Sequence, residues 1–281
     1  GLATDVVETS TVAPTASIIV NSPLSAVSES STEGLVFEVF LSDPVENPVQ
    51  VSGIDLSGSA TPDVDFSTLE VSSDGGDTWT NLTDSGFELA ADGTPMLVKI
   101  PPMTDGIYEG IENVVLELIT TDPQVEATDT NPSGEGEIID GDTPTLTLGN
   151  ATATEGDNLV FEGTLSNPTI NNETFTLSPN FASATNDDVK INEMVVTYEN
   201  GQETVTIPVN EDGEFTLPAG VINFNIVLPT IVDAIYEGNE SFSLGITAES
   251  DYITNPDVAN ASITDGDKPI LSIQATDAIA V

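Results

Sequence analysis

Hydrophobic and polar positions alternate in several short runs along the chain. In the first clear run, Leu35, Phe37, Val39 and Leu41 fall on one face and the residues between them on the other. Because successive side chains of a strand point to opposite faces, this period of two predicts a β-strand with one face in a core. The same period recurs in three more runs: Val114, Leu116 and Leu118; Leu159, Phe161 and Leu165; Phe242, Leu244 and Ile246.

Turn-forming residues separate these runs. The hairpin-type sequences are Asp74-Gly75-Gly76, Asp92-Gly93, Asn200-Gly201 and Asp212-Gly213. Prolines stand mainly beside or between the runs, where a missing amide does least harm, and no stretch combines a helical period with caps. We therefore predict an all-β fold of tandem Ig-like antiparallel β-sandwiches with Greek-key topology, arranged end to end, each with about seven or more strands.

The chain also repeats itself with a period of about 125 residues, the separation of Asp140 and Asp265. The clearest matched pair is Asp105-Gly106-Ile107-Tyr108-Glu109-Gly110 and Asp233-Ala234-Ile235-Tyr236-Glu237-Gly238. Three more pairs keep the same order: Leu35-Val36-Phe37-Glu38 with Leu159-Val160-Phe161-Glu162, Ser59-Ala60-Thr61 with Ser183-Ala184-Thr185, and Asp140-Gly141-Asp142 with Asp265-Gly266-Asp267. We expect a linker over 1–14, one sandwich over 15–142, a second over 143–267, and the first strand of a third copy within 268–281.

Composition narrows the possible functions. The 281 residues include 48 Asp and Glu against 3 Lys and Arg, which gives a formal charge of −45. Such a chain cannot neutralise phosphates, so we expect no binding to nucleic acid or to anionic lipid, and no apolar run approaches the ~18 residues of a membrane span. Hydrophobic residues are 38% of the chain, which is enough to bury a core despite the charge.

The chain lacks most of the side chains on which enzymes commonly rely for catalysis. Cys and His are absent, and the basic residues are all lysines, so nucleophile–base triads, metal–imidazole sites and arginine clamps are unavailable. Carboxylates are so numerous that no pair stands out as the acid and base of a glycosidase. We therefore expect a protein that is not an enzyme.

Acidic residues recur at the strand ends of both copies. The repeated acids are Glu29 or Glu33 with Glu155; Asp63 and Asp65 with Asp187 and Asp188; Asp105, Glu109 and Glu112 with Asp233, Glu237 and Glu240; Asp140 and Asp142 with Asp265 and Asp267. Loops at one end of a sandwich converge, and Ca²⁺ takes six to eight oxygen ligands from such loops. The alternative is that each acid is a solvated turn residue, since Asp-Gly is a favoured turn. Turn chemistry, however, does not require Glu at the same place twice.

Taken together, these motifs resemble a known family. Four motifs are similar to those of Calx-β domains. They are the Glu-Gly ahead of a Phe-containing strand, the Ala-Thr loop with its Asp, the Asp-x-x-Tyr-Glu-Gly-x-Glu element and the terminal Asp-x-Asp. They also resemble the related Ig-like repeats of very large bacterial surface adhesins exported by type I secretion, including those of RTX type. The resemblance covers both copies and implies Ca²⁺ as cofactor, an extracellular location on the bacterial surface, and neighbouring repeats of the same chain as partners.

The resemblance also implies a set of calcium ligands. In the first copy these are Glu29, Asp63, Asp65, Asp105, Glu109, Asp140 and Asp142, and in the second Glu155, Asp187, Asp188, Asp233, Glu237, Asp265 and Asp267. Two points stay open. Glu33 rivals Glu29, because two extra residues separate Glu29 from its strand. The alternative for Glu109 and Glu237 is that they accept hydrogen bonds from the loop backbone and bind no metal.

Two functions follow as expectations. The first is that of calcium-rigidified extender repeats of an adhesin, which project a distal ligand-binding region from the cell in attachment or biofilm formation. The alternative is that one repeat itself binds a sugar or a peptide. The segment that differs most between the copies, residues 72–95, contains Trp79, the single Trp of the chain and the candidate ligand-binding residue.

Overall fold

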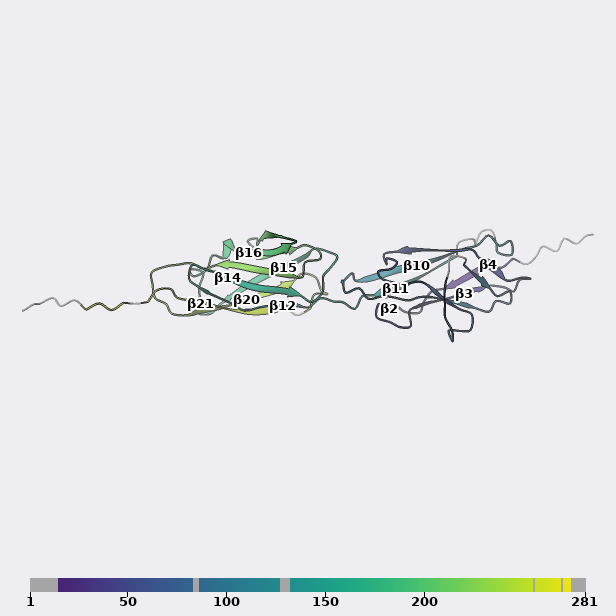
Figure 1. Ribbon diagram of the computed structural model, residues 1–281, viewed down its shortest axis with the longest axis horizontal. Helices are drawn as coiled ribbons and strands as arrows, with labels where there is room; N and C mark the ends of the chain where they lie inside the picture. Colours follow the sequence, from purple (N-terminus) through teal and green to yellow (C-terminus); the bar gives the residue numbers. More distant parts are fainter. Residues whose placement is uncertain (1–14, 83–85, 127–131, 255, 269, 274–281) are drawn as a thin grey trace, which may run out of the picture. The chain divides into compact units, whose positions relative to one another are not determined.

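The computed structural model divides the chain into two compact units, each built from β-strands (Figure 1). The structure describes residues 15–82, 86–126, 132–254, 256–268 and 270–273. The first unit comprises the chain up to Asp105 together with Glu109–Gly141, and the second comprises Gly106–Tyr108 and the chain from Asp142 onward.

The first unit is a sandwich of two sheets. One sheet has the strand order β1-β3-β9-β6-β7 and the other β2-β11-β10-β5, with a short pair β4-β8 beside them. Ser52, whose amide donates to the Ile119 carbonyl, is the single residue between β4 and β5, so these two strands form one interrupted strand. The strands are β1 (Ile18–Asn21), β2 (Val27–Ser28), β3 (Leu35–Leu41), β4 (Val49–Val51), β5 (Gly53–Gly58), β6 (Glu70–Ser72), β7 (Thr80–Asn81), β8 (Phe87–Leu89), β9 (Met96–Ile100), β10 (Ile111–Ile119) and β11 (Ser133–Ile139).

The second unit repeats this plan. Its sheets have the orders β12-β14-β19-β16-β17 and β13-β21-β20-β15-β18. The strands are β12 (Leu146–Leu148), β13 (Ala151–Thr154), β14 (Asn158–Leu165), β15 (Glu173–Phe181), β16 (Val195–Asn200), β17 (Glu203–Pro208), β18 (Glu214–Leu217), β19 (Asn223–Pro229), β20 (Glu240–Ala248) and β21 (Asp257–Thr264). A 3-10 turn, η1 (Ile191–Glu193), precedes β16.

The core of each unit confirms the alternation. In β3 the buried residues are Leu35, Phe37, Val39 and Leu41. The other predicted runs are buried in the same way at Val114, Leu116, Leu118, Leu159, Phe161, Leu165, Phe242, Leu244 and Ile246. Each unit therefore has its own hydrophobic core between its two sheets. The prediction of an all-β, Ig-like sandwich is confirmed.

The predicted turn sequences all lie between strands. Asn200-Gly201 joins β16 to β17, and Asp212-Gly213 joins β17 to β18. Asp74-Gly75-Gly76 lies between β6 and β7, and Asp92-Gly93 between β8 and β9. The glycines have positive φ, for example 69° at Gly201 and 83° at Gly213, which explains the choice of residue.

One strand pair in each unit is parallel. β2 pairs with β11 in this way, and β13 with β21. The pairing arises because the first strand of each sandwich changes sheets. β1 and β12 pair with the antiparallel neighbours β3 and β14, while β2 and β13 join the opposite sheet. This exchange brings the acid that follows β2 or β13 next to the end of β11 or β21.

The domain limits that the repeat predicts remain predictions. The linker over 1–14 lies outside the described residues, as do 269 and 274–281 of the expected third copy. Residues 270–273 form no strand, and Ile270 and Ile273 are about 90% exposed. A strand needs a partner for its backbone groups, and none of the described residues pairs with this segment.

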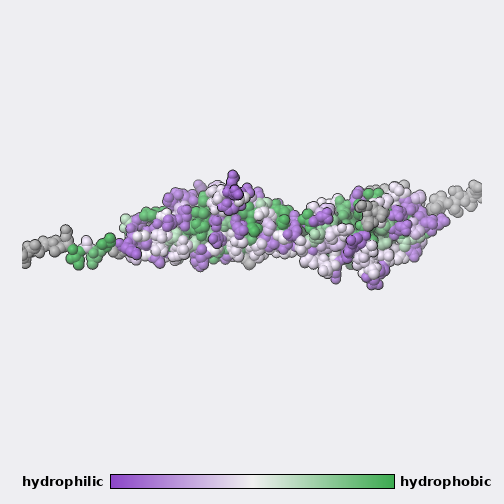
Figure 2. All heavy atoms as spheres, viewed as in Figure 1, coloured by the Kyte–Doolittle hydropathy of each residue, from purple (hydrophilic) through white to green (hydrophobic). Residues whose placement is uncertain are grey.

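The surface mixes hydrophilic and hydrophobic residues over the face seen in Figure 2. Fifteen large hydrophobic side chains count as exposed among the described residues, including Leu24, Val232 and Tyr236. Within the described part of the chain, no helix has the length and apolar character that a membrane crossing requires.

Candidate metal centre

Two acid-bearing loops are tied together by backbone hydrogen bonds in each unit. In the first, Asp65 Oδ2 accepts from the Thr61 amide at 2.5 Å, and the Asp65 carbonyl accepts from the Met103 amide at 2.8 Å. In the second, Asp188 Oδ2 accepts from the Thr185 amide at 2.6 Å, and its carbonyl accepts from Ile231 at 2.8 Å. The loop after Ser-Ala-Thr is thereby held against the segment that leads to Tyr-Glu-Gly.

The first Asp of each Asp-Gly-Asp sequence holds the Tyr-Glu-Gly loop. Asp140 Oδ2 accepts from the amides of Glu109 and Gly110, the latter at 3.3 Å. In the second unit Asp265 Oδ2 accepts from the amides of Glu237 and Gly238, the latter at 2.9 Å. In both units these hydrogen bonds fix the Tyr-Glu-Gly loop to the Asp-Gly-Asp sequence.

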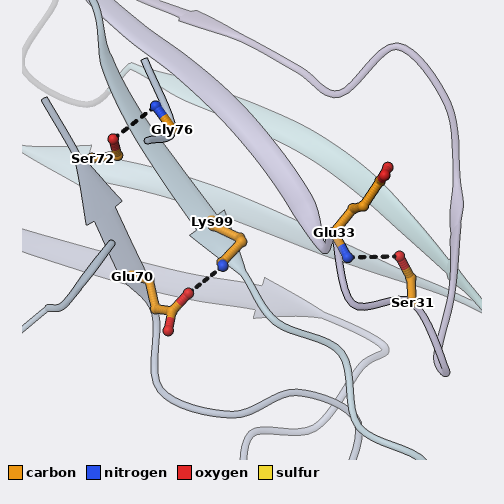
Figure 3. A network of polar contacts seen from close by, with 6 residues as sticks. All are labelled: Ser31, Glu33, Glu70, Ser72, Gly76 and Lys99. Atoms are coloured by element: carbon orange, nitrogen blue, oxygen red, sulfur yellow. Dashed lines mark hydrogen bonds and ion pairs between the residues drawn. The ribbon is translucent and has the colours of Figure 1, made fainter. Parts of the chain in front are cut away.

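The acid after the second strand reaches the middle glycine of the same Asp-Gly-Asp sequence. Glu29 Oε1 accepts from the Gly141 amide at 2.9 Å, and Glu155 Oε2 accepts from the Gly266 amide at 3.4 Å. Glu29 is buried, whereas its rival Glu33 is exposed. The Glu33 amide donates to Ser31 Oγ at 3.2 Å. Figure 3 shows this contact and the Glu33 carboxylate directed away from it. Glu29 is therefore the structural counterpart of Glu155.

In the first unit these loops bring three carboxylates into direct proximity. Oxygens of Asp65, Glu109 and Glu112 all lie within 4.8 Å of one another. Together with Glu29 and Asp140 they line one small cavity, whose apolar wall is formed by Met103 and Ile138. The cluster is thus partly enclosed on one side by hydrophobic side chains.

The second unit contains two overlapping carboxylate groups that share Glu155. One consists of Glu155, Glu237 and Glu240, and the other of Glu155, Asp265 and Asp267, each with oxygens within 4.8 Å of one another. We call these three groups the acidic clusters. Glu237 and Glu240 are the repeat counterparts of Glu109 and Glu112, whereas the third member is Glu155 in the second unit and Asp65 in the first.

Two carboxyl groups of the first-unit cluster have raised pKa values. Burial, and then the charge of Asp65, raises the pKa of Glu109 to about 7. Burial, followed by the charges of Asp65 and Glu109, raises the pKa of Glu112 to about 7. Close carboxylates oppose each other's ionisation, so Glu109 and Glu112 retain their protons to a higher pH than a solvated Glu.

The second unit shows the same pattern around Glu240. Burial, and then the charge of Asp188, raises the pKa of Glu240 to about 7, and the same two causes raise that of Glu237. Burial also raises the pKa of Glu155. At Asp265 burial acts in the same direction, but the amides of Gly238, Asp267 and Glu237 together lower its pKa.

The donor set fits a hard divalent cation. Its atoms are carboxylate oxygens from several loops, and Ca²⁺ prefers oxygen ligands. Zinc and copper sites usually contain nitrogen or sulfur ligands as well. The raised pKa values indicate that at neutral pH either protons or a cation must relieve the repulsion in the acidic clusters. A bound Ca²⁺ would supply two positive charges there, held by the carboxylates of the acidic clusters.

Six predicted ligands are less buried than Asp65 and Asp188. Asp63, Asp105, Asp187 and Asp233 are exposed, and Asp142 and Asp267 are half-buried. Asp63 has φ 64° and its amide donates to the Phe66 carbonyl, so it forms the turn. Asp233 Oδ1 accepts from the Ile235 amide at 2.6 Å, and Asp187 donates its amide to Thr185 Oγ1. Asp267 belongs to the second-unit group with Glu155, and Asp105 and Asp233 add charge near Glu109 and Glu237.

Glu112 and Glu240 are cluster residues that the list of predicted ligands omits. Both are the last residues of Tyr-Glu-Gly-x-Glu, so the repeat contains them. The alternation of buried and exposed positions distinguishes them more clearly. Glu240 lies on the same face of its strand as buried Phe242 and Leu244, and Glu112 lies on the same face as Val114. A Glu on the core-facing side at the start of a strand marks a carboxylate that points into the loop cluster.

Trp79, the candidate ligand-binding residue, lies half-buried beside a lysine. Lys99 Nζ is 4.3 Å from the centroid of the Trp79 ring, and Lys99 is also paired with Glu70 (Figure 3). An ammonium over an indole face is a stabilising cation–π contact. This contact gives Trp79 a role in packing the β6–β7 hairpin, while the prediction that it binds a ligand stays a prediction.

Comparisons with known proteins find likeness only among solved structures. No family model matches the chain, and no curated protein matches it in sequence. The apo form of the Calx CBD1 domain aligns at 11% identity with a TM-score of 0.33, covering 44% of this chain and 99% of that one. The calcium binding domain CBD12 of CALX1.1 aligns at 14% identity with a TM-score of 0.30, covering 79% and 76%. A variant of the CFA/I adhesin CfaE of enterotoxigenic E. coli aligns at 12% identity with a TM-score of 0.36, covering 91% and 87%.

Proposed function

We propose that the chain consists of calcium-binding extender repeats of a bacterial cell-surface adhesin, in which Ca²⁺ stiffens each sandwich end and the joints between successive repeats. The observation that carries the proposal is that Glu109 and Glu112 in the first unit, and their counterparts Glu237 and Glu240 in the second, each belong to a carboxylate group held by the same loop contacts. Each unit repeats the same three contacts, namely Glu29 or Glu155 to glycine, Asp65 or Asp188 to threonine, and Asp140 or Asp265 to the Tyr-Glu-Gly loop.

Calcium supplies the charge that the sequence lacks. With 48 acidic residues and 3 basic ones, few side chains can neutralise the acidic clusters. Carboxylates concentrated at loop ends repel one another, which loosens those loops when no cation is bound. Extracellular calcium modules bind with dissociation constants of about 10⁻⁴–10⁻³ M, so millimolar Ca²⁺ outside a cell fills them and the lower concentration inside does not.

The composition of the chain argues against several other functions and is compatible with the extender role. The chain has no Cys or His, and its acidic surface repels phosphates and anionic lipid. What remains is a stable sandwich whose repeated feature is a cation site at the loops. A repeated unit with a repeated site at the same loops suits a spacer better than a receptor, because a receptor needs only one recognition surface.

Thermal unfolding and small-angle scattering test this proposal together. A hundredfold excess of Ca²⁺ over its dissociation constant stabilises the folded chain by about 2.7 kcal/mol, which raises the melting temperature by several degrees. We expect that rise, together with a narrower distribution of maximum dimensions, on moving from EDTA to Ca²⁺. Sodium chloride at matched ionic strength is the control, because simple screening also relieves repulsion in so acidic a chain. An identical melting temperature and scattering profile in EDTA and in Ca²⁺ would end the proposal.

A further inference from the structure

A groove of about 600 Å³ opens on the second unit where two strands separate. β16 pairs with β19 from Val195 opposite Val227 to Thr197 opposite Asn225. Beyond Thr197, β16 continues only with β17, while β19 extends back to Asn223 beside β14. The sheet therefore splits at this point, and the end of β16 and the start of β19 form the two sides of the groove.

The groove is lined by hydrogen-bonding side chains on the outer face of the sheet. Glu162 lies directly opposite Asn225, and Thr164 directly opposite Asn223. Opposed residues of an antiparallel pair have Cβ atoms about 4.5–5.5 Å apart, so these four form a continuous polar strip. Glu199 and Asn200, both exposed, complete the other side of the groove.

This lining favours a neutral ligand rich in hydroxyl groups. Carboxylates accept hydrogen bonds, amides both donate and accept, and threonine does either, which matches the vicinal hydroxyls of a sugar. None of the three lysines lines the groove, so no positive charge there balances a phosphate, a sulfate or a carboxylate. Tyr198 and Phe224 add an apolar part to the lining, and about 600 Å³ falls within the range of small-ligand sites.

The first unit shows that the sandwich does not need this polar strip. At the positions of Thr164 and Asn225 the repeat places Phe40 and Leu97, with Glu38 opposite Leu97 just as Glu162 is opposite Asn225. The Glu38 carboxylate also accepts a hydrogen bond from Asn21 Nδ2 at 2.9 Å. Among the described residues the polar strip thus belongs to the second unit, whereas both units contain acidic clusters.

We propose that the groove on the second unit binds a neutral oligosaccharide through Glu162, Asn225, Thr164 and Asn223. The site is separate from the acidic clusters and does not depend on the extender role. Calcium binding can fail while sugar binding succeeds, and the reverse.

Titration of the full chain with neutral oligosaccharides, followed by two-dimensional amide NMR in constant Ca²⁺, tests the proposal. A panel of uncharged gluco-, galacto-, manno- and xylo-oligosaccharides is the probe. We expect amide shifts confined to the ends of β14, β16 and β19 for at least one sugar, and at least a tenfold loss of affinity in Asn225→Leu, which installs the first-unit residue. Glu162→Gln keeps the side-chain shape and removes the charge, so it should weaken binding less.

The matched control is Glu38→Gln, at the position in the first unit that corresponds to Glu162, and it should bind like the parent chain. Equal melting temperatures of the parent and variant chains separate lost binding from lost folding. The proposal is overturned if no neutral sugar shifts these amides. It is also overturned if Asn225→Leu binds normally. Sialylated glycans, sulfated glycans and uncharged peptides are titrated in the same way, and shifts of these amides by any of them but by no neutral sugar would likewise overturn it.

Discussion

Glu112 and Glu240 show how one residue links the strand pattern to the chemistry of the loops. Each stands at the first inward-facing position of a core strand, β10 or β20, and so points a carboxylate toward the loops rather than toward solvent. Burial and neighbouring carboxylates raise the pKa of both to about 7. A carboxylate in that position is stable only when a proton or a cation accompanies it.

Substituting these two residues should weaken calcium binding in a unit-specific manner. We expect Glu112→Gln to lower the affinity of the first unit, and Glu240→Gln that of the second, by about tenfold or more, because ligand charge sets the affinity of oxygen-ligated calcium sites. Calorimetric titration of each variant measures this. Glu203→Gln, exposed on β17 and outside the acidic clusters, is the control. Unchanged affinity in both cluster variants would show that these carboxylates do not ligate the ion.

Asp74 gives a residue-scale prediction that is independent of calcium. Its carboxylate accepts from the Thr78 hydroxyl and amide and from the Ser72 hydroxyl, and these contacts lower its pKa to about 2. A lowered pKa stabilises the folded state above pH 3.8, and this contribution is lost as the pH falls through about 2. We expect Asp74→Ala to lower the melting temperature by a few degrees at pH 7 and to change Trp79 fluorescence. At pH 2 the variant and the parent should differ less, and a constant difference would contradict this role.

At the scale of elements, the repeat and the alternation together predict most of the architecture. Burial of Leu35, Phe37 and their counterparts follows directly from the period of two, because a strand offers only two faces. The parallel pairs β2–β11 and β13–β21 could not be predicted in this way, because alternation carries no information on which strand lies next to which. They depend on a strand that changes sheets, which only the assembled sandwich reveals.

The candidate site follows a similar division. The repeat identifies the loops that converge, and both copies of Asp-Gly-Asp hold the Tyr-Glu-Gly loop. Within a loop, however, periodicity is lost, so the sequence cannot separate Asp65, which is buried, from Asp63, which turns outward. Glu29 and Glu33 differ for the same reason, because only the hydrogen bond to Gly141 distinguishes them.

The end of β5 provides a stability prediction at this scale. Gly58 has φ 125°, and a Cβ there would lie 2.2 Å from the Asn113 carbonyl oxygen of β10. We expect Gly58→Ala to lower the free energy of unfolding of the first unit by about 2 kcal/mol or more, through both backbone strain and the steric clash. Gly75→Ala is the control, because Gly75 also has positive φ, at 77°, but no atom within 4 Å of an added Cβ, and should lose only about 1 kcal/mol. Equal losses in denaturant unfolding would contradict the steric argument.

At the scale of the whole molecule, charge and stability are linked through pH. Glu109, Glu112 and Glu240 have pKa values of about 7 in the folded chain and 4.5 as the ordinary value. Between those pH values the folded chain binds more protons than the unfolded chain, so the free energy of unfolding falls as pH rises. We expect the calcium-free chain to be less stable in urea at pH 8 than at pH 5.5, and saturating Ca²⁺ to remove or reverse that difference. Greater stability of the calcium-free chain at pH 8 would contradict the cluster electrostatics.

The net charge of −45 thus has a local component, which the acidic clusters concentrate at the loops of each unit, and a dispersed component on the outer strand faces. The dispersed charges keep edge strands such as β17 from pairing with other chains, and the concentrated ones create the demand for a cation. Both units carry this arrangement, so the whole molecule should bind the ion at least once per unit.

Counting calcium tests that claim most directly. The full chain is dialysed against millimolar Ca²⁺ at pH 7.5, and the metal bound per chain is measured by elemental analysis against a parallel dialysis with EDTA. We predict at least two Ca²⁺ ions per chain at a saturating concentration, since each unit has its own acidic clusters. The paired variant Glu112→Gln, Glu240→Gln should retain fewer. A chain that binds no calcium above the EDTA sample would contradict the account.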